Sequence, residues 1–221
     1  MEIDYHIQPR SDTLLLFFSG WGTTPEVVRH LAIPSGWDYV TAYDYRTLPE
    51  TLSIRSGYRA IHLVAWSMGV WAADCLSALL PPLTTAVAIN GTPQPMHDEY
   101  GIPRQIFHDT LATLTDENRS RFDRRMCGGK KLLSVYESFS TRSTDDLRDE
   151  LRSTYDRVSP IIHYQAPQLA WTKALISEKD LIMPPQNQLR YWQKAGISTH
   201  IIPNIGHYPL YNYTSWLDLL H

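Results

Sequence analysis

The sequence is poor in cysteine and has no long apolar run. Its two cysteines, Cys75 and Cys127, form neither a C-x-x-C pair nor a Cys/His spacing typical of zinc sites. No metal site is therefore predicted. A disulfide between the two cysteines is an open alternative, but two isolated thiols are typical of a reducing compartment. No window of about 18 uninterrupted apolar residues occurs, so no membrane-spanning helix is expected.

The sequence also lacks an excess of charge of one sign and the common nucleotide-binding motifs. The formal net charge is -3 over 221 residues, which does not favour nucleic-acid binding. Neither G-x-x-x-x-G-K-[ST] nor G-x-G-x-x-G is present, so no nucleotide cofactor is predicted. The first ten residues, MEIDYHIQPR, lack the basic start and apolar stretch of a signal peptide. We therefore expect a soluble cytoplasmic protein, monomeric or weakly homo-oligomeric, with no membrane or nucleic-acid partner.

Strand and helix patterns alternate along much of the chain. Apolar runs bounded by turn residues predict buried strands over 13–19, 38–44, 60–66, 84–90, 168–177 and 198–203. Helical patterns lie between them, over 25–32, 68–80 and 185–196, and a last helix is expected near the C-terminus. This alternation predicts an α/β fold with a mostly parallel, doubly wound sheet.

A charged, helical block interrupts the alternation. Amphipathic helix patterns are predicted over 103–114, 116–126, 130–139 and 145–158. We therefore divide the chain into an α/β core of residues 1–95 and 165–221 and a helical lid of residues 96–164.

Ser67 lies in the stretch LVAWSMGVWAA, between a predicted buried strand and a predicted helix. Its surroundings match the G-x-S-x-G nucleophile elbow, with Ala65 in the place of the first glycine and Gly69 in the second. Small residues are needed there because the sharp turn crowds the backbone on both sides of the serine. The alternative is that Ser67 is an ordinary helix N-cap.

A nucleophilic serine needs a general base and a residue that orients that base. His207 follows a predicted strand in the loop IPNIGHYPL, where ligands bind in open α/β sheets. Asp180 also follows a predicted strand, and the order Ser67, Asp180, His207 is that of α/β-hydrolases. Glu178 is a nearby rival for the acidic position, and Asp156 and Asp218 are more distant ones. The alternatives are a surface histidine and an ordinary turn aspartate.

The stretch FFSGWGTTP supplies a further part of the predicted site. Gly20 and Gly22 let the backbone approach a ligand closely, so the N–H groups of Trp21 and Met68 are predicted to form an oxyanion hole. The indoles of Trp21 and Trp66 are predicted to line the substrate pocket. The alternative is a plain strand–helix turn containing glycine.

These motifs resemble the α/β-hydrolase superfamily over nearly the whole chain. Within it, FFSGWG, AWSMGV, INGTPQP, SEKDLIMPP and GHYPL are most similar to the BioG family of pimeloyl-acyl-carrier-protein methyl ester esterases of biotin synthesis. The resemblance implies a Ser67–His207–Asp180 triad, an oxyanion hole at Trp21 and Met68, an acyl-enzyme, and an acyl-carrier protein as the partner that bears the substrate. No cofactor is required for such chemistry.

The predicted lid carries a cluster of basic residues in RSRFDRRMCGGKK. Arg121, Arg124 and Arg125 of this cluster are candidate contacts for an acidic carrier protein. The alternative is a solvated helix face.

Two rival functions are also compatible with the sequence. One is a short-chain carboxylesterase or thioesterase of the same fold acting on small esters, and the other is a non-catalytic binding protein.

Overall fold

A single seven-stranded sheet organises the chain. The computed structural model describes residues 1–139 and 141–220. The strand order is β1-β3-β2-β4-β5-β6-β7, and every neighbouring pair is parallel except β1 with β3. The strands are β1 (Glu2–His6), β2 (Thr13–Phe18), β3 (Trp37–Tyr43), β4 (Ala60–Trp66), β5 (Thr85–Ile89), β6 (Lys173–Ser177) and β7 (Ser198–Ile202). This confirms the predicted mostly parallel α/β fold.

Strand β2 illustrates why the central strands read as continuous apolar runs. All six of its residues are buried, because both faces of the sheet are covered. Successive side chains of a strand point to opposite faces, so Leu14 and Leu16 enter one apolar core while Leu15 and Phe17 enter the other. A parallel sheet covered on both faces places its loops at the two ends of the strands.

Helices α1 (Met68–Cys75) and α6 (Pro185–Lys194) cover one face of the sheet, and α7 (Leu217–Leu220) lies against β4 and β5 on the other. The helix predicted over 25–32 is only a short 3-10 turn, η1 (Pro25–Val28). Its Val27 and Val28 side chains are buried in the second core, so a single turn satisfies the apolar pattern. Short 3-10 turns also occur at η2 (Ser77–Leu79) and η3 (Leu210–Asn212).

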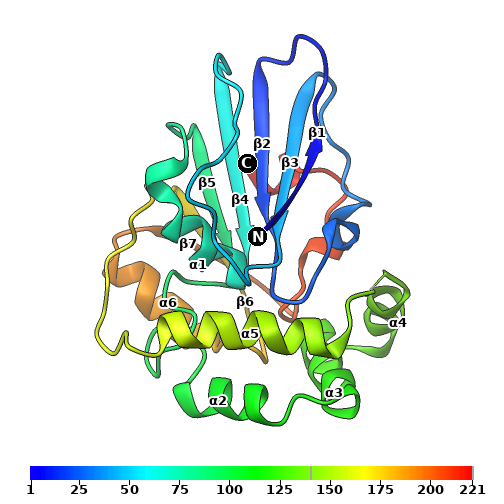
Figure 1. Cartoon of the computed structure of the whole chain (residues 1–221), viewed down its shortest axis with the longest axis vertical. Helices are drawn as coiled ribbons and strands as arrows, with labels where there is room; N and C mark the ends of the chain where they lie inside the picture. Colours follow the sequence, from blue (N-terminus) through cyan, green and yellow to red (C-terminus); the bar gives the residue numbers. More distant parts are fainter. Residues whose placement is uncertain (140, 221) are drawn as a thin grey trace.

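Four helices lie between β5 and β6 in the chain: α2 (Arg104–Ala112), α3 (Asp116–Cys127), α4 (Lys130–Phe139) and α5 (Thr144–Val158). They gather at the end of the sheet where the parallel strands terminate, and α5 crosses directly below the strand ends (Figure 1). Loops at the carboxyl ends of β2, β4, β6 and β7 therefore face the helices of the insertion. The boundaries between core and lid, at residues 95/96 and 164/165, remain a prediction.

Three further findings concern the described part of the chain. No helix there is long and apolar enough to cross a membrane. Within residues 1–139 and 141–220, no group of three or more His, Cys, Asp or Glu side chains is arranged to hold a metal ion. Both cysteines are free thiols, Cys75 exposed and Cys127 buried.

Candidate active site

Ser67 occupies a strained turn between β4 and α1. Its backbone has φ 56° and ψ -121°, which is unfavourable for a residue with a Cβ. The turn is held because the Ser67 N–H donates to the Ile89 carbonyl across the sheet at 2.8 Å. Ser67 stands at the N-cap position of α1, but its hydroxyl makes no capping hydrogen bond, so its side chain does not cap the helix.

The turn leaves no room for side chains around it. A Cβ added to Gly69 would lie 2.2 Å from the Phe18 carbonyl oxygen. One added to Gly91 would lie 2.4 Å from the Ser67 carbonyl oxygen. Both contacts are with backbone, which cannot move aside cheaply. These glycines are therefore required for close approach between neighbouring loops rather than for positive φ.

His207 joins Ser67 to Asp180 through two short hydrogen bonds. The His207 Nε2 atom lies 2.8 Å from Ser67 Oγ, and Nδ1 lies 2.8 Å from Asp180 Oδ2. An ionised carboxylate only accepts, so Nδ1 carries the proton and Nε2 is free to accept from the serine hydroxyl. The structure thus brings together the three residues that the sequence order suggested.

Asp180 is held by donors on both of its oxygens. Oδ1 accepts from the N–H groups of Ile182 and Met183 at 2.8 and 3.0 Å. Oδ2 accepts from Gln188 Nε2 at 2.9 Å as well as from His207. The carboxylate side chain is fully buried, so these donors replace its hydration. Sequence reasoning missed Gln188, which lies in α6 and has no motif that marks it.

The loop that carries His207 is tied to the strand before Ser67. The indole Nε1 of Trp66 donates to the His207 carbonyl at 2.8 Å, and Asn90 Nδ2 donates to the same oxygen at 3.0 Å. Trp66 is only 1% exposed and its ring packs on His207 and Tyr208. The prediction that Trp66 lines the substrate pocket is therefore wrong, because its ring is inside the core and supports the histidine loop instead.

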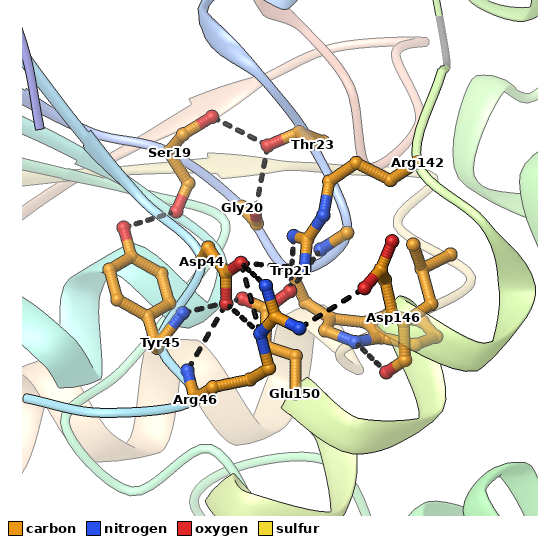
Figure 2. Close-up of polar contacts among 12 residues, drawn as sticks. Ser19, Gly20, Trp21, Thr23, Asp44, Tyr45, Arg46, Arg142, Asp146 and Glu150 are labelled. Carbon is orange, nitrogen blue, oxygen red and sulfur yellow. Dashed lines mark hydrogen bonds and ion pairs between the residues drawn. The ribbon is translucent and has the colours of Figure 1, made fainter. Parts of the chain in front are cut away.

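The loop after β2 places Trp21 beside the site. Its indole Nε1 donates to the Leu147 carbonyl of α5 at 2.9 Å (Figure 2), and its ring meets Phe122 edge-on with centroids 5.0 Å apart. Among the described residues, the backbone N–H groups of Trp21 and Met68 donate to no protein acceptor. Both are therefore available for a ligand.

A small pocket of about 40 Å³ opens onto Ser67. Its walls are mostly apolar side chains from the core and from the inserted helices, with one basic side chain, Arg125. The lining residues are Trp21, Ser67, Met68, Ile102, Ile106, Phe107, Thr110, Phe122, Arg125, Leu151, Leu181 and Ile182. The arrangement suits an apolar chain whose reactive carbonyl reaches Ser67.

An outer hollow adjoins this pocket between α2 and α3. The two share Ile106, Thr110, Phe122 and Arg125 in their walls. Arg121 and Arg124 line the outer hollow only. The hollow beside these arginines and the pocket at Ser67 are therefore adjacent.

The three candidate carrier contacts differ in their surroundings. Arg121 is paired with Glu117, with Nη2 and Oε1 2.6 Å apart on an exposed helix face. Arg124 and Arg125 are exposed and form no ion pair with any residue of 1–139 or 141–220. These two guanidinium groups therefore remain available to an acidic partner.

Asp123 lies on α3 beside this cluster but points inward. Its nearest cation is Arg119, whose Nε is 3.8 Å from Asp123 Oδ2. Burial raises the pKa of Asp123 to about 6, and Arg119 offsets part of the effect. The acidic residue within the basic stretch is therefore a buried group rather than part of its charged surface.

Comparisons with known proteins identify the family of the chain. The family model described as "Pimeloyl-ACP methyl esterase BioG" matches residues 1–219. The crystal structure of BioG from Haemophilus influenzae superposes with a TM-score of 0.90 at 36% identity, covering 100% of both chains.

Two further proteins are similar over most of this chain. A malonyl-[acyl-carrier protein] O-methyltransferase of Bacteroides fragilis is 40% identical over 191 residues, which are 84% of this chain but only 38% of that protein. The esterase EaEST from Exiguobacterium antarcticum has a TM-score of 0.70 at 14% identity, with 95% and 89% of the two chains covered, and it shares the fold. The chain is thus an α/β-hydrolase and a carboxylic ester hydrolase, and it belongs to the BioG family.

Proposed function

We propose that this enzyme hydrolyses the methyl ester of pimeloyl-acyl-carrier protein in biotin synthesis, with Ser67, His207 and Asp180 as its catalytic triad. The observation that carries the proposal is the hydrogen-bonded series Ser67 Oγ–His207 Nε2 and His207 Nδ1–Asp180 Oδ2, with 2.8 Å at each step. Nucleophile, base and orienting acid are within reach of one another, as serine hydrolysis requires.

The proposed reaction has two halves. Ser67 Oγ attacks the ester carbonyl carbon while its proton passes to His207 Nε2. The bond to the methoxy oxygen then breaks, and that oxygen takes the proton from His207 and leaves as methanol. In the second half, water gives a proton to His207 and attacks the acyl-enzyme. Ser67 Oγ regains the proton and the free acid departs, while Asp180 stays ionised throughout and stabilises the imidazolium.

Trp21 and Met68 have the role of oxyanion donors in this proposal. Their backbone N–H groups have no protein acceptor among the described residues, and the Met68 N–H stands at the N-terminus of α1, where the helix dipole favours negative charge. Two such donors stabilise the tetrahedral oxyanion more than the ground-state carbonyl.

The substrate proposal rests on the family and on the methyltransferase relative. A segment similar to this chain occurs in a protein named for methylating an acyl-carrier protein. An enzyme of that name makes a methyl ester on a carrier, which is the bond that a methyl esterase removes. The mostly apolar pocket walls suit an acyl chain, and in this proposal the thioester end lies on the side of the outer hollow, which shares Ile106, Thr110 and Phe122 with the pocket.

The test compares the purified enzyme on three substrates: the methyl ester of pimeloyl-acyl-carrier protein, free monomethyl pimelate, and an acyl thioester. We expect methanol release from the carrier-bound ester, with much slower turnover of the other two. Ser67→Ala should abolish turnover and labelling by a fluorophosphonate probe, and Asp180→Asn should lower kcat by about 10³-fold or more because it disturbs the histidine tautomer.

A growth assay extends the test to the cell. Wild-type enzyme should restore growth of a biotin auxotroph that lacks its methyl esterase, and Ser67→Ala should not. Preferential turnover of thioesters would contradict the substrate proposal. Full activity of folded Ser67→Ala would contradict the proposed nucleophile.

A further inference from the structure

Glu150 is a buried carboxylate that serves no step of the proposed reaction. It lies on α5, is fully buried, and reaches out of its helix to the loop that carries Trp21. Its Oε2 accepts from the Gly22 N–H at 3.2 Å, and its Oε1 accepts from the Tyr45 N–H at 2.9 Å (Figure 2). One carboxylate thus binds the backbone after two different strands, β2 and β3.

Arg142 balances the charge of Glu150. Its Nη1 lies 2.5 Å from Glu150 Oε2, and its Nη2 lies 3.2 Å from Asp44 Oδ2. Asp44 is in turn paired with Arg46, which also reaches Asp146 on α5 at 3.1 Å (Figure 2). Burial raises the pKa of Glu150, and the Arg142 guanidinium opposes that effect. The network keeps a carboxylate where an unpaired charge would be costly.

The same helix also holds the side chain of Trp21. The Trp21 indole donates to the Leu147 carbonyl, three residues before Glu150. Gly22 has φ +73°, and a Cβ there would lie 3.0 Å from Leu147 Cγ, so α5 packs directly on the loop. The backbone before Trp21 is also held, since Thr23 Oγ1 donates to the Gly20 carbonyl and Tyr45 Oη donates to the Ser19 carbonyl. Glu150 contributes to this hold as well, because it binds the Tyr45 N–H.

We infer that Glu150 is a positioning residue for the oxyanion hole: by fixing the Gly22 N–H, it sets where the adjacent Trp21 N–H points. A buried ion pair contributes little net stability compared with apolar packing, but it defines one geometry. A small displacement of an oxyanion donor lowers the rate because the donor acts on the transition state. The inference rests on the proposed oxyanion role of Trp21.

The test is Glu150→Gln in the full-length enzyme, with hydrolysis of p-nitrophenyl acetate as the assay. Glutamine keeps the size of the side chain but has only one acceptor oxygen, so either the Gly22 or the Tyr45 N–H loses its partner. We expect kcat to fall about 10- to 100-fold with KM changed by less than about twofold. The control is Asp149→Asn, which removes one carboxylate from the neighbouring exposed position of α5 and should leave kcat unchanged.

A second readout separates positioning from general loss of structure. A trifluoromethyl ketone forms a negatively charged tetrahedral adduct with the serine, whereas the neutral amide acetamide binds without becoming an oxyanion. In Glu150→Gln, the affinity for the ketone should fall in proportion to kcat/KM, and the affinity for acetamide should stay nearly constant. Equal loss of both affinities would overturn the inference.

The double variant Arg142→Gln, Glu150→Gln keeps the test decisive if Glu150→Gln folds poorly. It removes both buried charges together, so neither is left unpaired. We expect it to fold and still show the reduced kcat. Wild-type kcat in the folded double variant would overturn the inference. Failure of the proposed function looks different: Ser67→Ala would then be as active as the wild type.

Discussion

The Trp66 indole and the His207 carbonyl are joined by a hydrogen bond of 2.8 Å. It links the last residue of β4, directly before the proposed nucleophile, with the loop that holds the proposed base. The two residues are 141 positions apart in the chain. The spacing between the elbow and the histidine loop is therefore set by a buried side chain as well as by the sheet.

Trp66→Phe tests the importance of this bond. Phenylalanine keeps an aromatic ring in the core but has no N–H, and the His207 carbonyl retains only Asn90 Nδ2 as a side-chain donor. We expect a loss of about 1–3 kcal/mol in the free energy of unfolding, and kcat lowered by about 3- to 10-fold because the base shifts. Urea denaturation and ester hydrolysis measure the two effects.

Trp37→Phe is the matched control, since the Trp37 ring stacks on His62 at the other end of the sheet. It should change stability without changing kcat. Wild-type kcat in Trp66→Phe would show that the histidine loop holds its position without the indole.

Gly69→Ala tests the close approach at the elbow. The added methyl group would lie 2.2 Å from the Phe18 carbonyl oxygen and 2.5 Å from that of Ser19, which is the backbone leading into the Trp21 loop. We expect a loss of at least about 2–3 kcal/mol in the free energy of unfolding, together with most of the activity. Thermal unfolding and esterase assays check this outcome.

The control for this substitution is Gly129→Ala, because a Cβ at Gly129 would meet nothing within 4 Å. That variant should be as stable as the wild type. If Gly69→Ala unfolds at the same temperature as the wild type and remains active, the elbow does not require glycine at that position.

Asp123→Asn tests the buried carboxyl on α3 through its pH dependence. The pKa of Asp123 is about 6 in the folded chain, above its ordinary value of 3.8. Between these values the folded chain binds a proton that the unfolded chain has lost, so stability falls as the pH rises. Asp123→Asn has no ionisable group at this position, so its free energy of unfolding does not fall in this way. Relative to that of the wild type, it should rise by about 2 kcal/mol between pH 4.5 and pH 7.

Urea denaturation of both proteins at the two pH values measures the difference. Asp149→Asn, at an exposed position on α5, is the control for removal of one carboxylate. A constant difference between Asp123→Asn and the wild type across this range would mean that Asp123 ionises alike in the folded and unfolded chains.

The sequence predicted those features that depend on local pattern. β4 was expected over residues 60–66 and occupies Ala60–Trp66, because an apolar run ending in an elbow motif has clear limits. The helix expected over 25–32 is only a 3-10 turn, since two buried valines satisfy the pattern there. The sequence predicts Trp66 in the pocket, but the alternation of side chains along a strand turns its ring into the core.

The parts that escaped prediction are polar contacts between residues distant in sequence. Glu150 binds the N–H groups of Gly22 and Tyr45, which are 128 and 105 residues away. A charged residue in an amphipathic helix is normally predicted to face solvent, and the sequence around Glu150 does not indicate that its side chain is fully buried. Gln188, which holds Asp180, was missed for the same reason.

Arg124→Glu tests recruitment of an acidic carrier protein to the outer hollow. Arg124 lines that hollow but not the pocket above Ser67, and it is unpaired among the described residues. Charge reversal should raise KM for the carrier-bound ester by about 10-fold at low salt, with kcat nearly unchanged, and added salt should reduce the effect. Arg121→Glu should have a smaller effect because Glu117 already neutralises Arg121.

Small esters separate docking from chemistry in this prediction. Hydrolysis of p-nitrophenyl acetate by Arg124→Glu should match the wild type, whereas Arg125→Glu should slow it because Arg125 also lines the inner pocket. Arg10→Glu, at an exposed position in the connection between β1 and β2, controls for the change in net charge. If KM for the carrier-bound ester is the same in Arg124→Glu and the wild type at low salt, the carrier does not dock at this arginine. An equal rise in KM for the free ester would instead place the effect in the pocket, because a docking contact acts only on the carrier-bound substrate.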